Sequence, residues 1–104
     1  MIYEERIYTI KPGYTAEYLK NYEELALDIL MECLGNLVGF WQTEHGPLNL
    51  LIHIWAFEGL DDRLARREKL ARHPDWPAYL KVNYPLLLAQ ESRILLPAPF
   101  SPLK

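Results

Sequence analysis

The chain has 104 residues, of which 50% are hydrophobic and 24% are charged, and its net charge is −3. This length and composition predict one globular domain with a single core, residues 1–104. The eleven basic residues form no run longer than Arg66-Arg67, which excludes the charge pattern of proteins that bind nucleic acids or anionic membranes, and one cysteine excludes an internal disulfide.

The N-terminal third predicts a strand followed by a long helix. Residues 2–10 are rich in β-branched and tyrosine residues and end at a Pro-Gly turn, so they form the first predicted strand. Alternation places Glu4, Arg6 and Tyr8 on one of its faces, where Glu4 and Arg6 either pair inside the protein or face water on an edge strand. Across residues 15–34 apolar side chains recur every three or four positions, which predicts an amphipathic helix. Its apolar stripe comprises Tyr18, Leu19, Tyr22, Leu25, Ala26, Ile29, Leu30 and Cys33.

Residues 36–57 predict a β-hairpin. Two apolar runs, 37–43 and 48–57, flank a short connection that contains Gly46-Pro47. In the second run the even positions are aliphatic, whereas the odd positions include polar and aromatic groups. The odd residues are Asn49, Leu51, His53, Trp55 and Phe57. We interpret the even face as core and the odd face as the lining of an interior shared by two subunits.

The register of this hairpin decides which residues join the odd face. Regular pairing around the turn places Gln42 opposite Asn49 and puts Phe40 on the same face as the odd residues. A β-bulge would instead shift the first strand by one residue and replace Gln42 with Thr43 or Glu44.

Acidic residues after Gly59 begin a second helical pattern, which continues to Arg72. On this helix Arg63, Arg67 and Leu70 fall on one stripe. The arginines either form a solvated face, or one of the two leans toward a cavity and holds an anionic ligand group.

The last part of the chain predicts three shorter elements. A second short helix follows His73-Pro74-Asp75 and ends at Tyr84-Pro85. Residues 86–89 predict a further helical turn, and residues 90–96 predict the final strand. The tail after residue 96 is too rich in proline to continue a sheet.

This order of elements predicts an α+β fold of the ferredoxin-like type, β-α-β-β-α-β, with an antiparallel four-stranded sheet and helices on one side. The other face of the sheet is too apolar to remain in water, and the chain has little left to cover it. We therefore expect a homodimer in which two copies pack sheet to sheet and form a dimeric α+β barrel.

The candidate site lies on the odd face of the hairpin. His53 is the candidate catalytic residue, because its ordinary pKa of about 6.5 suits proton transfer near neutral pH, although a histidine on a strand can also be purely structural. The candidate ligand-binding residues are Arg6, Tyr8, Phe40, Asn49, Trp55 and Arg63. The sequence has no glycine-rich phosphate loop, no dinucleotide fingerprint and no metal-ligand spacing among its three histidines, so we predict no cofactor and no metal.

Several segments resemble the NIPSNAP family. The matching residues are 8–13, 34–49, 53–55, 63–67, 73–76 and 93–103. This resemblance implies the dimeric α+β barrel, a superfamily of folds that also hosts cofactor-independent monooxygenases, but it does not supply a reaction. Three positions, Glu5, Leu50 and Gly59, depart from the family pattern. Larger animal relatives have a mitochondrial presequence and duplicated domains, and their roles are not transferred to this chain.

The expected location follows from the N-terminus and the hydropathy. The chain begins with a strand pattern instead of a signal peptide, and no apolar run approaches about 18 residues, so we expect a cytoplasmic protein.

Three functional hypotheses follow, and the sequence leaves open whether the protein is an enzyme. The first is a homodimer that binds a small apolar or aromatic ligand in the barrel cavity. The second is a cofactor-independent monooxygenase or isomerase that acts on a small aromatic or quinone-like compound, with His53 as the base. The third is a purely structural dimer whose interior is filled by its own side chains.

Overall fold

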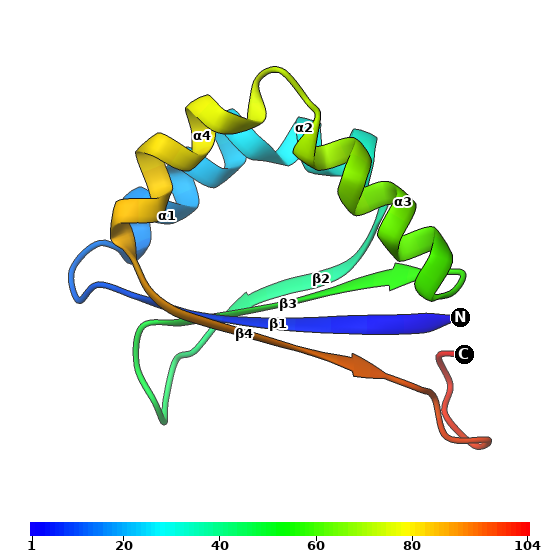
Figure 1. Ribbon diagram of the computed structural model, residues 1–104. Coiled ribbons are helices and arrows are strands. Elements are labelled where there is room, and N and C mark those ends of the chain that lie inside the picture. The colour runs from blue at the N-terminus through cyan, green and yellow to red at the C-terminus, as the bar shows by residue number, and fades with distance from the viewer.

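The computed structural model describes residues 1–104 as a four-stranded antiparallel sheet with all helices on one of its faces (Figure 1). The strands are β1 (Ile2–Ile10), β2 (Asn36–Gln42), β3 (Leu50–Phe57) and β4 (Leu87–Leu95). They lie in the order β2-β3-β1-β4, so β1 and β3 are central. This topology confirms the predicted ferredoxin-like α+β fold.

The predicted long helix is confirmed as one continuous helical stretch. It comprises α1 (Thr15–Asn21), the π-helical turn η1 (Tyr22–Ala26) and α2 (Leu27–Cys33). Leu25 lies within the π-helical turn and is 46% exposed, so it is outside the core in which the sequence placed it. Gly35 follows the helix with a φ of +88°, a conformation that glycine adopts without a steric penalty.

The second helical region contains α3 (Leu60–Ala71), α4 (Trp76–Asn83) and the 3-10 turn η2 (Tyr84–Leu86). The helical turn predicted at residues 86–89 is wrong for its last three residues, which belong to β4. Leu87 pairs with Ile10 and Ala89 pairs with Thr9. Strand β1 therefore pairs with this segment on both sides of a register shift at Leu88, and pairing in the sheet overrides the local helical preference.

The hairpin has a longer connection than the sequence predicted. Strand β2 ends at Gln42, which pairs with Leu51, and Phe40 pairs with His53. The pairing is shifted by two residues from the regular hairpin, and because a shift of two preserves the face, Phe40 still lies beside His53. Asn49 lies in the connection with a φ of 63°, and its carbonyl accepts a hydrogen bond of 2.9 Å from the backbone N–H of Ile10.

The assignment of the two faces of β3 to core and subunit interface is wrong. Leu51, His53, Trp55 and Phe57 are at most 2% exposed, and they pack beneath the helices of the same chain. Their aromatic rings pack against the tyrosines of the first helix, as His53 does against Tyr22 with ring centroids 6.3 Å apart. The imidazole and indole therefore belong to the core of one chain.

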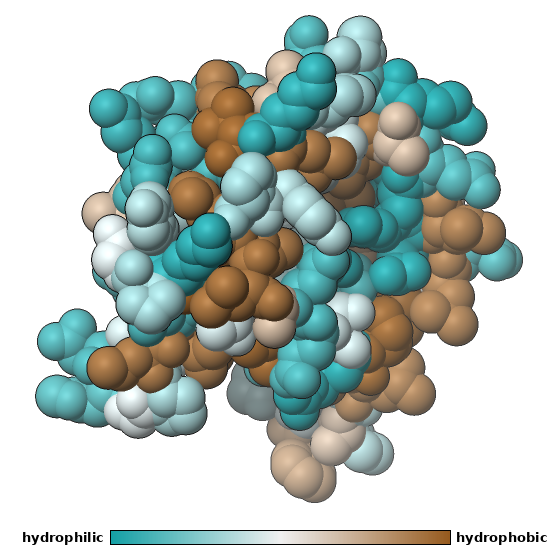
Figure 2. Space-filling view, turned by 60° about the vertical axis from the view of Figure 1, so that its left-hand side comes forward, coloured by the Kyte–Doolittle hydropathy of each residue, from teal (hydrophilic) through white to brown (hydrophobic).

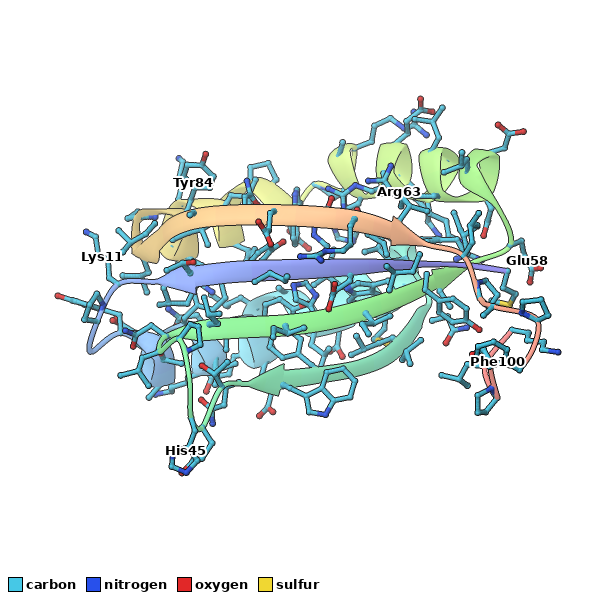
Figure 3. All side chains as sticks on the ribbon, turned by 90° about the horizontal axis from the view of Figure 1, so that it is seen from below. Lys11, His45, Glu58, Arg63, Tyr84 and Phe100 are labelled. Atoms are coloured by element: carbon cyan, nitrogen blue, oxygen red, sulfur yellow. The ribbon has the colours of Figure 1, made fainter.

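The opposite face of the sheet, which we call the open face, carries no helix (Figure 3). We define it by Tyr3, Ile7, Trp41, Leu50, Ile52 and Ile54. Trp41 is 52% exposed, and its ring lies over Gly39, where the Cβ of any other residue would collide with it. The proline-rich tail folds against only one end of this face.

Figure 2 shows another side of the molecule, on which apolar residues and hydrophilic residues are intermixed. No helix of the structure is both long enough and apolar enough to cross a membrane.

Candidate functional site

A cavity of about 250 Å³ lies between the helices and the sheet. Its walls include Arg6, Tyr8, His53, Trp55, Arg67 and Tyr79. Cavities that bind small ligands begin at about 300 Å³, so this one is slightly smaller than the lower limit of that range. The sequence predicted a cavity between the sheets of two subunits, whereas this cavity lies within one chain.

The register of the two central strands assembles one wall of the cavity. Arg6 on β1 pairs with His53 on β3, and Glu4 pairs with Trp55 two residues away. Paired residues of an antiparallel sheet point to the same face, and so do residues two apart on one strand. Four candidate residues from two segments of the sequence consequently lie together under the helices: Arg6, Tyr8, His53 and Trp55.

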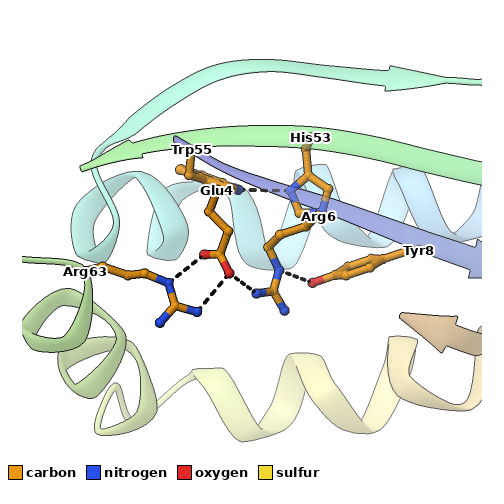
Figure 4. Close-up of polar contacts among 6 residues, drawn as sticks. All are labelled: Glu4, Arg6, Tyr8, His53, Trp55 and Arg63. Carbon is orange, nitrogen blue, oxygen red and sulfur yellow. Dashed lines mark hydrogen bonds and ion pairs between the residues drawn. The ribbon is translucent and has the colours of Figure 1, made fainter. Parts of the chain in front are cut away.

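The Trp55 indole fixes the tautomer of His53. The indole N–H of Trp55 donates a hydrogen bond of 2.9 Å to Nδ1 of His53 (Figure 4). An indole N–H only donates, so Nδ1 is the acceptor and the neutral imidazole carries its proton on Nε2. Phe40 stacks on the imidazole with ring centroids 4.6 Å apart, and Tyr8 meets it edge to face at 4.8 Å. In this cage of rings, Nε2 is buried without a hydrogen-bond partner.

His53 is neutral at physiological pH. Burial, followed by the positive charge of Arg6, lowers the pKa of His53 to about 3. A neutral imidazole that is protonated on Nε2 and occupied at Nδ1 has no free site for another proton. The geometry thus favours His53 as a hydrogen-bond donor over the predicted role of general base.

Glu4 lies at the centre of a buried ion-pair cluster (Figure 4). Its carboxylate is 1% exposed and accepts hydrogen bonds from Nη2 of Arg63 at 2.8 Å, Nε of Arg63 at 3.1 Å and Nη1 of Arg6 at 3.0 Å. Nε of Arg6 also donates to the Tyr8 hydroxyl at 3.0 Å. Of the two alternatives for Glu4 and Arg6, the enclosed pair is therefore correct.

The arginines determine the charge state of Glu4. Burial alone would raise its pKa, but the hydrogen bonds from Arg63 and the charges of Arg6, Arg63 and Arg67 together hold the pKa of Glu4 below its usual value. The carboxylate is consequently ionised at neutral pH.

Arg67 lines the cavity but pairs with no carboxylate. Burial and the neighbouring positive charge of Arg6 lower the pKa of Arg67 from its usual value. Of the two arginines that share the α3 stripe, Arg63 is bound to Glu4, and Arg67 is the one that leans into the cavity.

The helical wall of the cavity is held by a buried asparagine. Asn83 is 1% exposed, and its amide Nδ2 donates to the carbonyl of Tyr18 and to the hydroxyl of Tyr79, both at 3.1 Å. Its Oδ1 accepts a hydrogen bond of 3.0 Å from Asn21. Burial raises the pKa of Tyr18 and of Tyr79, so both hydroxyls remain protonated. This network fixes α1 against α4 and so holds the helical wall of the cavity in place.

The predicted site residues thus divide into two groups. Arg6, Tyr8, His53 and Trp55 line the cavity. Three other candidates do not: Phe40 supports the His53 ring, Arg63 binds Glu4, and Asn49 lies in the hairpin connection.

The sequence missed Asn83 and did not assign Arg67 among its site residues. Arg67 was signalled by its place on the α3 stripe. For Asn83 the only signal was an amide at helical spacing from Tyr79, which does not distinguish a buried network from a surface residue.

Comparisons with known proteins place these features in context. The NIPSNAP family model matches residues 3–102. Human Protein NipSnap homolog 3A is 34% identical over 106 residues, an alignment that covers 100% of this chain and 42% of that protein. The chain therefore spans about two-fifths of the length of this relative.

Solved structures of NIPSNAP family proteins also match this chain in sequence and in fold. The crystal structure of a NIPSNAP family protein from Agrobacterium tumefaciens has 47% identity and a TM-score of 0.96, and the match covers 99% of this chain and 98% of that one. A putative antibiotic biosynthesis monooxygenase from Nitrosomonas europaea has a TM-score of 0.67, with 93% of this chain and 98% of that one covered. Its identity is 10%, so the likeness concerns the fold alone.

Proposed function

Since this chain belongs to the NIPSNAP family, whose sequence and fold it shares along almost its whole length, we propose that it binds a small ligand with an aromatic or apolar body in the cavity beneath its helices. The observation that carries this proposal is the cavity of about 250 Å³ beside polar groups that have no partner in the chain. Aromatic rings from both the sheet and the helices would contact the ligand body.

The unpartnered Nε2–H of His53 supports a ligand with an oxygen acceptor. A buried donor without an acceptor costs about 1–3 kcal/mol. A ligand oxygen that accepted this hydrogen bond would recover part of that cost, which is a reason for such a donor to persist beside a cavity.

The three tryptophans allow the binding site to be located by NMR. Trp55 and Trp76 line the cavity, whereas Trp41 lies on the open face. In ¹⁵N-labelled protein titrated with one-ring and two-ring aromatic compounds, we expect the indole N–H signals of Trp55 and Trp76 to shift together and that of Trp41 to stay in place. Each signal is assigned with a Trp→Phe variant.

A shift of the Trp41 signal alone would locate binding on the open face and contradict the proposal. No shift of any indole signal across the panel would also contradict it, and would favour a purely structural protein.

Catalysis is the second candidate function, and the His53 donor is the observation that favours it. A neutral imidazole N–H and nearby guanidinium groups would stabilise an oxyanion formed from a phenol or quinol, as a cofactor-independent monooxygenase or isomerase requires. The cavity lining, however, includes no aspartate or glutamate to act as the base. If a bound compound is converted to a product during the same titration, as seen in the NMR spectrum of the compound, the function is catalysis and not simple binding.

We also propose that two copies associate through the open face. Ile52 lies at its centre, opposite Ile7 and Trp41, and no helix covers these side chains. Contiguous apolar surface of this kind is unfavourable in water and is typical of subunit interfaces. The association would form the second layer of the predicted barrel.

Sedimentation equilibrium tests this association. We expect a mass close to twice 12.2 kDa for the wild type and close to 12.2 kDa for Ile52→Glu, because a buried unpaired charge at the centre of an apolar interface opposes association. Leu64→Glu is the control, since Leu64 is 56% exposed on α3, on the other side of the molecule, and this variant should remain dimeric. A monomeric wild type would reject the proposal.

A further inference from the structure

The guanidinium groups around the cavity outnumber the carboxylates. Arg6, Arg63 and Arg67 surround the single carboxylate of Glu4, which leaves two uncompensated positive charges. No aspartate or glutamate is among the residues that line the cavity itself. Charges enclosed in a protein are usually paired, because removal from water is costly.

The uncompensated positive charge lies on the guanidinium groups of Arg6 and Arg67. Glu4 accepts hydrogen bonds from Arg63 and from Nη1 of Arg6, whereas Nη2 of Arg6 has no partner in the chain. Arg67 forms no ion pair, although it is half-buried at the cavity wall. Both guanidinium groups therefore retain N–H donors for a ligand.

We infer that the ligand carries an anionic oxygen group, a carboxylate or a phosphate, and that Arg67 binds this group together with Arg6 at the wall of the cavity. This inference rests on the proposed function and names the class of ligand for the same site. A planar guanidinium presents parallel N–H groups that match two oxygens of a carboxylate or phosphate, and such charge-assisted hydrogen bonds are the stronger ones.

The remainder of the cavity defines the rest of the ligand. The rings of Tyr8, Tyr22 and Tyr79 line it, and burial raises the pKa of Tyr22 and Tyr79, so these two hydroxyls stay neutral. They add hydrogen-bonding groups and apolar area but no negative charge. The expected ligand is accordingly a small aromatic compound with an acidic group at one end.

Three probes share the same two-ring body, and two of them, the carboxylate and the amide, also match in shape, so that their comparison separates charge from size. They are 2-naphthoate, 2-naphthyl phosphate and 2-naphthamide, titrated into the full chain at pH 7 with the indole signals of Trp55 and Trp76 as the readout. We expect at least one of the two anions to bind about tenfold more tightly than the neutral amide. The tighter anion identifies the acidic group as a carboxylate or a phosphate.

Substitutions on α3 assign this preference to one side chain. Arg67→Gln should remove the preference for the anion, measured as the ratio of the dissociation constants of amide and anion, and Arg67→Lys should retain part of it because the charge remains. Arg72→Gln is the matched control, since Arg72 is an exposed arginine at the end of the same helix, outside the cavity. This control should keep the wild-type preference.

The outcomes distinguish the inference from the proposed function. Equal binding of the amide and both anions, or an anion preference that survives Arg67→Gln, would overturn the inference while the cavity remained a ligand site. Failure of all three probes to shift Trp55 or Trp76 would count against the proposed function, and the inference would fall with it.

Discussion

Glu4→Gln is expected to lower the free energy of unfolding by about 3 kcal/mol, which corresponds to a decrease of about 12 °C in the melting temperature of a domain of this size. The substitution preserves the shape of the side chain but removes the only carboxylate in the cluster. Arg6 and Arg63, whose side chains are 14% and 28% exposed, would then repel each other and Arg67 without compensation. Urea denaturation followed by circular dichroism measures the effect.

Glu91→Gln is the control for this prediction, and because Glu91 pairs with Ile7 on the open face, both variants are compared in the monomeric Ile52→Glu background. Glu91 also pairs with an arginine, Arg93, at 3.0 Å, but the side chains are 63% and 56% exposed. Exposed ion pairs contribute about 0–1 kcal/mol, so the control should differ little from the wild type. Equal losses in the two variants would show that enclosure of Glu4 contributes nothing.

The stabilising effect of Glu4 should depend on pH in a defined direction. Because the arginines hold the pKa of Glu4 below its unfolded value, the folded state releases this proton more readily than the unfolded state. The contribution is therefore complete above about pH 5 and is lost as the pH falls through the folded pKa. The difference between the wild type and Glu4→Gln should shrink in the same range.

Periodicity predicted the elements and the topology because both depend on local pattern. Alternation grouped Glu4, Arg6 and Tyr8 on one face of β1, and the structure keeps them together. The same rule paired Phe40 with the His53 face despite a register error of two residues, since a shift of two does not change the face.

The local sequence pattern could not decide which of the two faces of the sheet packs against the helices. Both faces of β3 contain large apolar side chains, and their alternation does not show which face the helices cover. The structure places Trp55 and His53 under the helices because their rings complement Tyr18 and Tyr22 on the first helix. That complementarity joins segments 30 residues or more apart in the sequence, so it emerges only from the packing.

Two further parts of the site, the arginines of α3 and the hairpin connection, show the same limit. Arg63 and Arg67 occupy equivalent positions on the α3 stripe, and which of them is free depends on which one reaches Glu4 across the fold. Asn49 was assigned to the strand, but β3 begins one residue later because the chain needs a left-handed residue in the connection. Asparagine tolerates that conformation, a preference of the backbone that alternation does not register.

His53 should make the protein less stable as the pH falls below neutrality. In the unfolded chain a histidine binds a proton near pH 6.5, whereas burial and the charge of Arg6 lower the pKa of His53 in the folded state to about 3. Between these values the unfolded state holds more protons than the folded state, so protons favour unfolding. The free energy of unfolding falls by at most about 1.36 kcal/mol for each pH unit, and by less close to pH 6.5, where the unfolded histidine is only half protonated. The loss between pH 6.5 and pH 4.5 is therefore about 2 kcal/mol.

Thermal unfolding at half-unit steps from pH 7.5 to pH 4.5 measures this dependence. His53→Gln retains an oxygen that can accept from the Trp55 indole but does not titrate, so its melting temperature should change less with pH above pH 5, whatever its absolute stability. His45→Gln is the control, because His45 is exposed at the tip of the hairpin and should leave the wild-type slope intact (Figure 3). Above pH 5 the Glu4 carboxylate remains ionised, so the two effects occupy separate pH ranges. A wild-type slope in His53→Gln would mean that His53 is protonated in the folded protein, and would restore it as a candidate for proton transfer.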